Sequence, residues 1–422
     1  MITAKAFAGN HYAVYGLARS GLATAEALAA SGARVTAWDA DEGARASAPA
    51  GIRIASLDEA DLSQFESLVV TPGLPLNRHP VAGRALDAGL EIIGDIELFA
   101  RARSELPRHK VVGITGTNGK STTTALVHHI LRAAGVPTTM GGNIGLPILG
   151  QDPLPEGGVY VLELSSYQID LTKSLDCDVA VLLNVTPDHL DRYESFEAYA
   201  ASKGRLFEIQ SAPQFAFVNW DSFTAGLVNP AAKFNGIALP RWARQAEWPA
   251  LQGPHNAQNA AAAIAVCEVL DVARKEIEDG LRTYPGLPHR MERVGDKDGI
   301  IFINDSKATN PTATAPALAA FERIRWICGG QAKTDNLEEC SPFFGHVRKA
   351  YTIGQAGELF ASLLSPHMAV AQCKTLERAV GIAAAEAETG DTVLLSPACA
   401  SFDQFRDFED RGDQFRELVE GL

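Results

Sequence analysis

The sequence predicts an α/β protein with three domains in tandem, each built on a mainly parallel sheet. At 422 residues the chain is too long for one hydrophobic core. Short apolar runs alternate with helical patterns along its length. Runs such as "GVYVLELSSYQI" and "DVAVLLNVTPDHLDRY" are apolar and then end in polar residues. This pattern is typical of parallel strands that helices cover on both faces.

The first block opens with "HYAVYGLARSGLATAEALAASGARVTAWDAD", which predicts one strand–helix–strand unit. Its turn, Gly16-x-Ala18-x-x-Gly21, is close to the dinucleotide fingerprint, and Asp39 ends the second strand. Ala18 crowds the backbone approach to a pyrophosphate. NAD therefore competes with another phosphate ligand and with plain strand–helix packing, and it is the less favoured interpretation. "SLVVTPGLP" predicts another strand and turn, and "GLEIIGDIELFARAR" predicts a strand that runs into a helix.

Proline and polar segments predict the domain boundaries. Pro107 and "PRHK" indicate a linker near residues 98–108, and "YPGLPHRMERV" indicates a second boundary near 285–291. The third block alternates strands and helices again through "GIIFINDSKATNP", "RIRWICGGQAK", "KAYTIGQ" and "DTVLLSPACASFDQF". The predicted domains are residues 1–98, 99–290 and 291–422.

Composition restricts the class of protein. Hydrophobic residues make up 46% and charged residues 21%, as in an ordinary soluble domain. The net charge of −14 argues against a nucleic-acid partner or an acidic membrane surface. The first ten residues lack the apolar core of a signal peptide, and no run approaches a membrane span. Six scattered cysteines without a C-x-x-C pair favour reduced thiols over disulfides or zinc, so we expect a cytoplasmic protein.

The stretch "VVGITGTNGKSTTTALVHHIL", residues 111–131, has the layout of a phosphate-binding loop between a strand and a helix. The common spacing places a glycine where this chain has Ile114. "GKST" is nevertheless intact, and Asn118 and Gly119 can turn backbone N–H groups toward an anion. A glycine turn that only joins strand to helix is the alternative. We expect a nucleoside triphosphate site.

Candidate metal ligands follow two strands of the same block. Glu163 ends one strand and His189 lies in the loop after another. A carboxylate and a hydroxyl suit Mg²⁺. A lone histidine is more often structural, and the nearby Asp188 and Asp191 compete with it. Lys203 lies on a predicted helix, where spacing alone indicates a surface lysine.

Seven motifs occur in an order that resembles the Mur ligases. They are "GITGTNGKST", "LELSSYQ", "NVTPDHLDRY", "HNAQN", "LPHRME", "NDSKATNP" and "LSPACASFDQFRDFEDRG". The resemblance covers all three blocks. It implies a Rossmann-like N-terminal domain, a central P-loop ATPase domain and a Rossmann-like C-terminal domain. It also implies a ligase of peptidoglycan synthesis that uses ATP to add D-glutamate to UDP-N-acetylmuramoyl-L-alanine.

The resemblance implies a role for each matched residue. ATP would be held by Gly116, Thr117, Asn118, Gly119, Lys120, Ser121 and Thr122, with Asn256 and Asn259 at the adenine and Arg290 and Asp305 reaching the nucleotide from the third block. Ser121 and Glu163 would hold a first Mg²⁺, and His189 a second. Lys203 matches a lysine that the family carbamylates, which would support the metal site.

Further matches concern the other two substrates. The UDP-sugar would contact Ser20, Asp39, Thr71, Gly73, Asn143, Ser165 and Gln168. The amino-acid end would be surrounded by His289, Lys307, Thr309, Lys333, Ser401 and Phe408. Gln331 stands where other members often have an acid, and Arg19 and Ala40 have no secure match.

The implied chemistry is amide formation through an acyl phosphate. Lys120 and two Mg²⁺ ions would offset the charge of the triphosphate, and Lys307 would steady the acyl phosphate. His289 is a hypothesis for the base that takes the proton of the amine, and a substrate hydrogen bond is its alternative. We also expect a monomer that closes about residues 285–291. The rival interpretations are another amino-acid ligase of this fold, a nucleotide-regulated binding module and a NAD dehydrogenase.

Overall fold

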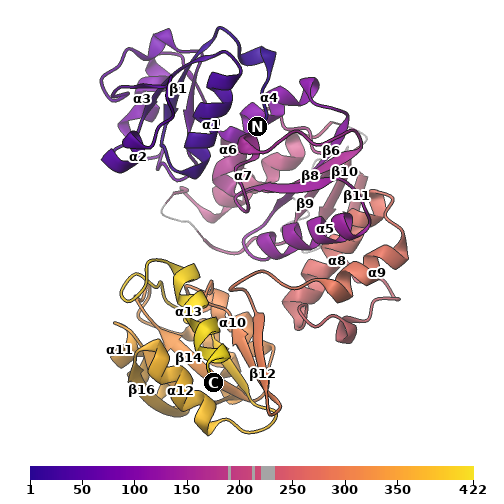
Figure 1. Cartoon of the computed structure of the whole chain (residues 1–422), viewed down its shortest axis with the longest axis vertical. Helices are drawn as coiled ribbons and strands as arrows, with labels where there is room; N and C mark the ends of the chain where they lie inside the picture. Colours follow the sequence, from indigo (N-terminus) through magenta and orange to yellow (C-terminus); the bar gives the residue numbers. More distant parts are fainter. Residues whose placement is uncertain (189–191, 212–213, 220–232) are drawn as a thin grey trace. The chain divides into compact units, whose positions relative to one another are not determined.

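The computed structural model describes residues 1–188, 192–211, 214–219 and 233–422, and these residues form three sheets (Figure 1). Each predicted domain range contains one sheet. The chain divides into two compact units, one with residues 1–241 and 258–280 and the other with residues 242–257 and 281–422. The predicted α/β class with mainly parallel sheets is confirmed.

The first sheet is parallel throughout, with strand order β3-β2-β1-β4-β5. Its strands are β1 (His11–Tyr15), β2 (Arg34–Trp38), β3 (Arg53–Ile54), β4 (Ser67–Val70) and β5 (Glu91–Ile93). The helices are α1 (Arg19–Ala30), α2 (Glu42–Ala46), α3 (Pro80–Asp87) and α4 (Asp95–Ala102). The connection from β1 through α1 to β2 is the predicted strand–helix–strand unit.

The second sheet has the order β11-β10-β9-β6-β8-β7, and its pairs are parallel. Its strands are β6 (His109–Thr115), β7 (Thr138–Gly142), β8 (Gly158–Glu163), β9 (Val179–Leu182), β10 (Phe215–Val218) and β11 (Lys233–Gly236). The helices are α5 (Lys120–Ala133), α6 (Ser166–Asp170), α7 (Phe196–Glu208), α8 (Pro254–Val269) and α9 (Arg274–Thr283). Strands β8 and β9 are buried at every position, as their apolar runs predict.

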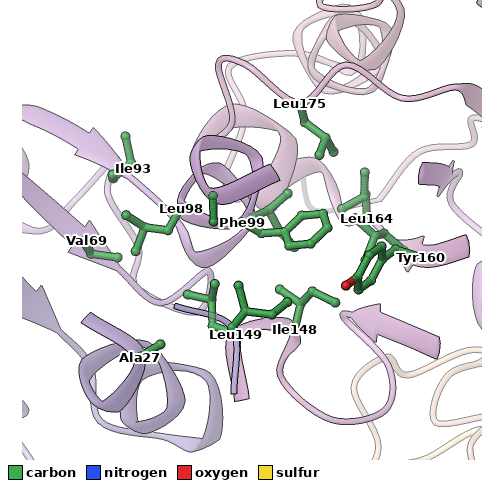
Figure 2. Close-up of a cluster of buried hydrophobic side chains, with 14 of the residues drawn as sticks. Ala27, Val69, Ile93, Leu98, Phe99, Ile148, Leu149, Tyr160, Leu164 and Leu175 are labelled. Atoms are coloured by element: carbon green, nitrogen blue, oxygen red, sulfur yellow. The ribbon is translucent and has the colours of Figure 1, made fainter. Parts of the chain in front are cut away.

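Helix α4 fills the segment where a linker was predicted to begin. Its apolar residues Leu98 and Phe99 are fully buried in a cluster that also contains Val69 of β4 and Tyr160 of β8 (Figure 2). The buried carboxylate of Glu97 accepts bonds from the backbone of Lys173 and Ser174. The helical spacing of these apolar residues gives α4 a face to bury, so the segment packs instead of spanning solvent.

The third sheet has the order β12-β13-β17-β14-β15-β16, with one antiparallel pair at its edge, β12 with β13. Its strands are β12 (Glu292–Lys297), β13 (Ile300–Asn304), β14 (Ile324–Gly329), β15 (Val347–Ile353), β16 (Ala369–Lys374) and β17 (Thr392–Leu395). The helices are α10 (Pro311–Ala319), α11 (Gly357–Leu364), α12 (Leu376–Glu386) and α13 (Phe408–Glu420). The strands predicted from "GIIFIN", "RIRWICGG", "KAYTIGQ" and "DTVLLS" are present as β13, β14, β15 and β17.

Helices cover both faces of the third sheet. Leu394 of β17 packs in the apolar cluster that contains Leu318 of α10 and Phe360 of α11. Its neighbour Leu395 packs in the opposite cluster with Val380 of α12 and Phe415 of α13. Because successive side chains of a strand point to opposite faces, one apolar run serves two helical layers. Within the described residues, no helix has both the length and the apolar content needed to cross a bilayer.

Candidate active site

Three neighbouring strands of the second sheet end at the predicted phosphate site. The glycine loop follows β6, Glu163 ends β8, and Asn184 lies just past β9. These strands are adjacent and parallel, so their carboxyl ends share one edge of the sheet. Ligands of open α/β sheets bind at this edge.

Backbone geometry makes glycine necessary in the phosphate loop. Gly119 has φ of 85° and precedes the first residue of α5. A Cβ at Gly119 would lie 2.3 Å from Oδ1 of Asn259, and one at Gly116, with φ of 151°, would lie 3.3 Å from the backbone N of Asn184. The N-terminal N–H groups of a helix lack intrahelical partners and favour an anion. Loop and helix end together have the geometry that a phosphate cradle requires.

Residues after β9 hold the phosphate loop in place through hydrogen bonds. Asn184 bonds Asn118 twice, through Oδ1 to the backbone N at 2.8 Å and through Nδ2 to the backbone O at 3.0 Å. The hydroxyl of Thr117 accepts from the backbone N of Thr186 at 3.0 Å and lies 3.1 Å from the hydroxyl of Tyr199. Asn184 and Tyr199 were not among the predicted site residues. Asn184 could have been identified from the sequence, because it is the first polar residue after an apolar strand.

Two lysines converge on one carbonyl group of the loop. Nζ of Lys120 donates to the carbonyl oxygens of Gly116 and Thr117, both at 2.8 Å. Nζ of Lys203, from α7, donates to the same Gly116 oxygen at 3.1 Å and lies 4.5 Å from the ring centroid of Tyr199. Lys203 is only 2% exposed, so the surface position indicated by spacing alone is wrong.

Burial first, and then the nearby Lys120 cation, lower the pKa of Lys203 from 10.5 to about 7. Desolvation disfavours a charged amine, and a second cation adds repulsion. A large fraction of Lys203 is therefore a neutral, nucleophilic amine at neutral pH. Carbamylation requires that form of the side chain.

Glu163 fits a magnesium site. It is 2% exposed; Oε1 accepts from Nδ2 of Asn143 at 2.9 Å, whereas Oε2 has no hydrogen-bond partner among the described residues. A buried, unsatisfied carboxylate oxygen is costly unless a cation or water satisfies it. Ser121, in the first turn of α5, is also buried. His189 lies outside the described residues.

The adenine candidates lie in the first two turns of α8. Asn259 is buried, and its Oδ1 accepts from Oγ1 of Thr123 at 3.3 Å, which places it beside the phosphate loop. Asn256 donates from Nδ2 to the backbone O of Gln252 at 3.1 Å. Thr122 is the third residue of α5.

The predicted UDP-sugar residues follow adjacent strands of the first sheet. Asp39, after β2, accepts from the backbone N of Leu17 at 2.6 Å and of Asp41 at 2.9 Å, so it shapes the glycine turn. Thr71, after β4, packs so closely that a Cβ at Gly16 would lie 2.3 Å from its Oγ1. Ser20 lies in the first turn of α1.

Other predicted contacts of this substrate have structural partners. Ser165 and Gln168 form a capping box at the start of α6. The backbone O of Gly73 accepts from Arg192 at 3.4 Å, and Arg19 donates to the backbone O of Gly145 at 3.1 Å. Asn143 follows β7 and joins Glu163 through backbone and side chain.

In the second unit, most residues predicted to surround the incoming amino acid follow β13, β17 and β14. These three strands are neighbours in the sheet and parallel. Nζ of Lys307 lies 3.6 Å from the ring centroid of Phe408, and Nζ of Lys333 donates to Oγ1 of Thr309 at 3.3 Å. Ser401 is buried. Gln331 pairs through its backbone with Ala400, so this loop keeps its place without the acid that other members often carry.

His289 has an unusual backbone and a crowded ring. Its φ is 60°, and a Cβ on Gly412 of α13 would lie 2.1 Å from its Nδ1. Nδ1 lies 3.1 Å from the amide nitrogen of Asn304, which makes Nδ1 the acceptor in that pair. Nε2 lies 3.7 Å from Oδ1 of Asp413. Burial lowers the pKa of His289, which favours a neutral ring.

Asp305 directly follows β13 and is buried. It accepts from Oγ of Ser396 at 2.8 Å and from the backbone N of Met291 at 3.2 Å, and Met291 is the chain neighbour of Arg290. Burial raises its pKa to about 7.

Arg411, which sequence reasoning missed, is completely buried and donates to Oγ and O of Ser306 and to the carbonyls of Cys399 and Ala400. It ties together the loops that carry Lys307 and Ser401. The only indication of Arg411 in the sequence was its position, one helical turn after Phe408.

Family models match two parts of the chain. One is described as the Mur ligase middle domain and matches residues 114–239. The other is described as the Mur ligase glutamate ligase domain and matches residues 289–399. The two matched ranges contain the strand ends described above for the second and third sheets.

Relatives match along the whole chain. A protein of Novosphingobium aromaticivorans named UDP-N-acetylmuramoylalanine--D-glutamate ligase is 58% identical, covering 100% of this chain and 97% of the relative. One of the same name from Zymomonas mobilis is 53% identical, with 100% of both chains covered.

Solved structures share the fold. UDP-N-acetylmuramate-alanine ligase from Thermotoga maritima has a TM-score of 0.59 at 17% identity, covering 98% of this chain and 99% of that one. MurF ligase from Thermotoga maritima in complex with ADP has a TM-score of 0.58 at 18% identity, covering 81% and 90%. The chain belongs to the Mur ligase family.

Proposed function

We propose that this chain is an ATP-dependent ligase that joins D-glutamate to UDP-N-acetylmuramoyl-L-alanine in peptidoglycan synthesis. The observation that carries the ATP site is the convergence of Lys120 and Lys203 on one carbonyl of a helix-initiating glycine loop. Relatives that match this chain from end to end and bear this activity in their name support the choice of substrates.

The reaction begins with an unreactive carboxylate. Transfer of the γ-phosphoryl group of ATP to the carboxylate of the UDP-linked substrate gives an acyl phosphate and ADP. The amine of D-glutamate attacks the acyl carbon, loses a proton, and the tetrahedral intermediate expels phosphate. Positioning and charge neutralisation supply most of the catalysis in phosphoryl transfer. Lys120 would leave the loop carbonyls to bind the γ-phosphate.

Mg²⁺ would be held by Glu163 and Ser121, and when bound it would offset the negative charge of the phosphates. The unpartnered Oε2 of Glu163 supports this assignment. The neutral amine of Lys203 would attack CO₂, form a carbamate and release one proton. The resulting anion would remove the repulsion between Lys203 and Lys120 and support the metal site. His189 would hold a second Mg²⁺.

The residues of the second unit would handle the incoming amino acid. Lys333, Thr309, Ser401 and Phe408 would hold D-glutamate, and Lys307 would neutralise the acyl phosphate. His289 would lie near the amine, as a base or as a hydrogen-bonding contact. Since one chain carries every predicted site residue, we infer that a monomer acts, and that it acts in the cytoplasm, where ATP is available.

Phosphate release tests the proposal. With ATP and UDP-N-acetylmuramoyl-L-alanine, D-glutamate should support release, and L-glutamate and diaminopimelate should not. Lys120→Ala should lose at least roughly 10²-fold in kcat because the triphosphate loses its cation. Lys110→Ala, at an exposed position of β6, is the matched control and should retain activity. Release with diaminopimelate but not with D-glutamate would contradict the proposal.

A further inference from the structure

Asp95 is a buried carboxyl group that the proposed mechanism does not use. It is the first residue of α4, two residues past the end of β5, and is 4% exposed. Oδ1 accepts from the backbone N of Ile96 at 3.0 Å. Oδ2 is buried and has no hydrogen-bond partner among the described residues. A buried polar atom without a partner calls for a physical explanation.

Asp95 lines a void of about 10 Å³ together with two predicted contacts of the UDP-sugar. The hydroxyl-bearing residues of the void are Ser20 and Thr24 from α1 and Thr71 after β4. Ser20 and Thr71 are also predicted contacts of the UDP-sugar. The void is about the size that one water molecule needs. Because Oδ2 has no partner among the described residues, a single water in this void would connect Asp95 to these hydroxyl groups.

Among the described residues that line the void with Asp95, none carries a compensating charge. The other residues that line the void, from β1, α1, β4 and the loop after β4, are Val14, Gly21, Val69, Val70 and Pro72 in addition to the three hydroxyl residues. Arg19, at the start of α1, donates instead to the backbone of Gly145, and Glu97 of α4 is paired with Arg101. Burial accordingly raises the pKa of Asp95 to about 6.

The protonation state of Asp95 determines whether the nearby hydroxyl groups can donate hydrogen bonds to the substrate. An ionised carboxylate accepts their protons and turns them away from the pocket. A neutral acid donates its own O–H to a hydroxyl oxygen or to the bridging water, and the hydroxyl proton then stays available for an anion. A negative charge beneath the pocket also repels a diphosphate.

We propose that Asp95 is a positioning residue of the UDP-sugar pocket, which as a neutral acid orients Ser20 and Thr71 to donate to the substrate diphosphate. This inference rests on the proposed function, since it takes the UDP-linked substrate as the ligand. Binding of that substrate is then coupled to the uptake of one proton by Asp95.

The coupling has a defined pH dependence. Well below pH 6 Asp95 is protonated before the substrate binds, and affinity for the UDP-linked substrate is greatest. As pH rises, each binding event must recruit a proton, so KM for this substrate rises by up to roughly tenfold per pH unit. The rise ends at the higher pKa that Asp95 has in the complex. KM for ATP and for D-glutamate does not share this dependence.

Asp95→Asn is the test, because an amide has the shape of the acid and donates at every pH. The variant should keep kcat and flatten the pH profile of KM for the UDP-linked substrate between pH 5.5 and roughly pH 8. In calorimetry with buffers of different ionisation enthalpy, the wild-type protein should take up protons on binding UDP-N-acetylmuramoyl-L-alanine near pH 7. The diphosphate diester and the carboxylate of this ligand do not titrate there.

Two outcomes would overturn the inference. One is a parallel pH profile for Asp95→Asn and wild type. The other is the absence of proton uptake by the wild-type protein, which decides the matter even if the variant does not fold. Failure of the proposed function is a separate result: the wild-type protein would then release no phosphate, or would not bind the UDP-linked substrate at any pH.

Discussion

Lys203 shows how a single residue changes meaning between sequence and structure. Helical spacing indicates a surface lysine, yet its amine is buried against Tyr199 and the carbonyl of Gly116. The lowered pKa follows from this burial and from Lys120. Since the folded state binds the proton more weakly than the unfolded chain, stability rises with pH from about 7 toward 10.5.

We predict that activity depends on CO₂ through Lys203. In CO₂-depleted buffer, phosphate release should fall, and added bicarbonate should restore it more fully above pH 7 than below, because only the neutral amine reacts. Lys203→Arg stays cationic and should lose roughly 10–100-fold in kcat, as expected for a group that supports a metal site. The variant should not respond to bicarbonate. A response equal to that of wild type would contradict the assignment.

His289 has two interpretations that kinetics can separate. A base needs a free lone pair, but Nδ1 accepts from Asn304 and the remaining nitrogen faces Asp413. This network favours a contact with substrate over proton transfer. We predict that His289→Gln raises KM for D-glutamate and leaves kcat and its pH profile nearly unchanged. A fall in kcat of roughly 10²–10⁴-fold, with loss of one limb of the pH profile, would identify His289 as the base.

At the scale of elements, parallel strands bring the predicted site residues together. Residues that are distant in the chain, such as Gly116, Glu163 and Asn184, meet because β6, β8 and β9 end at the same edge. The same geometry places Asp305, Ser396 and Gln331 together after β13, β17 and β14. Apolar runs that end in polar residues predicted this arrangement.

Helix α13 has a glycine where it meets His289, and a matched substitution tests the contact. A Cβ at Gly412 would lie 2.1 Å from Nδ1 of His289, so Gly412→Ala should destabilise the protein by about 1–3 kcal/mol. Gly381 of α12 is exposed and has open space around its Cβ position, so Gly381→Ala should stabilise by about 0.5–1 kcal/mol. Thermal unfolding should show shifts of opposite sign. Equal shifts in melting temperature for the two variants would mean that the imidazole of His289 does not lie against Gly412.

At the scale of the whole molecule, the proposed reaction would need groups from both compact units. Lys120 and Glu163 belong to the first unit, and Lys307 and Ser401 to the second. Hinge closure about residues 285–291 stays a prediction. The backbone N of His289 donates to Glu292, and that of Met291 donates to Asp305. Because these bonds hold His289 and Met291 to the third sheet, we expect the hinge to lie before His289.

Small-angle scattering tests the closure. An ATP analogue with UDP-N-acetylmuramoyl-L-alanine should reduce the radius of gyration, because closure excludes water that would hydrolyse an acyl phosphate. The analogue alone, or Lys120→Ala with both ligands, should give less compaction. An unchanged radius with both ligands bound to the wild-type protein would argue against closure.

The sequence by itself determined the α/β class, the sheets of the three blocks and the phosphate loop, because hydrophobic period and glycine position are local properties of the chain. Its long motifs also indicated the family. The burial of Lys203, the bond from Asn304 to His289 and the unpartnered oxygens of Glu163 and Asp95 were decided only by tertiary structure. Each depends on which distant segments exclude water from a side chain, and no local pattern encodes that.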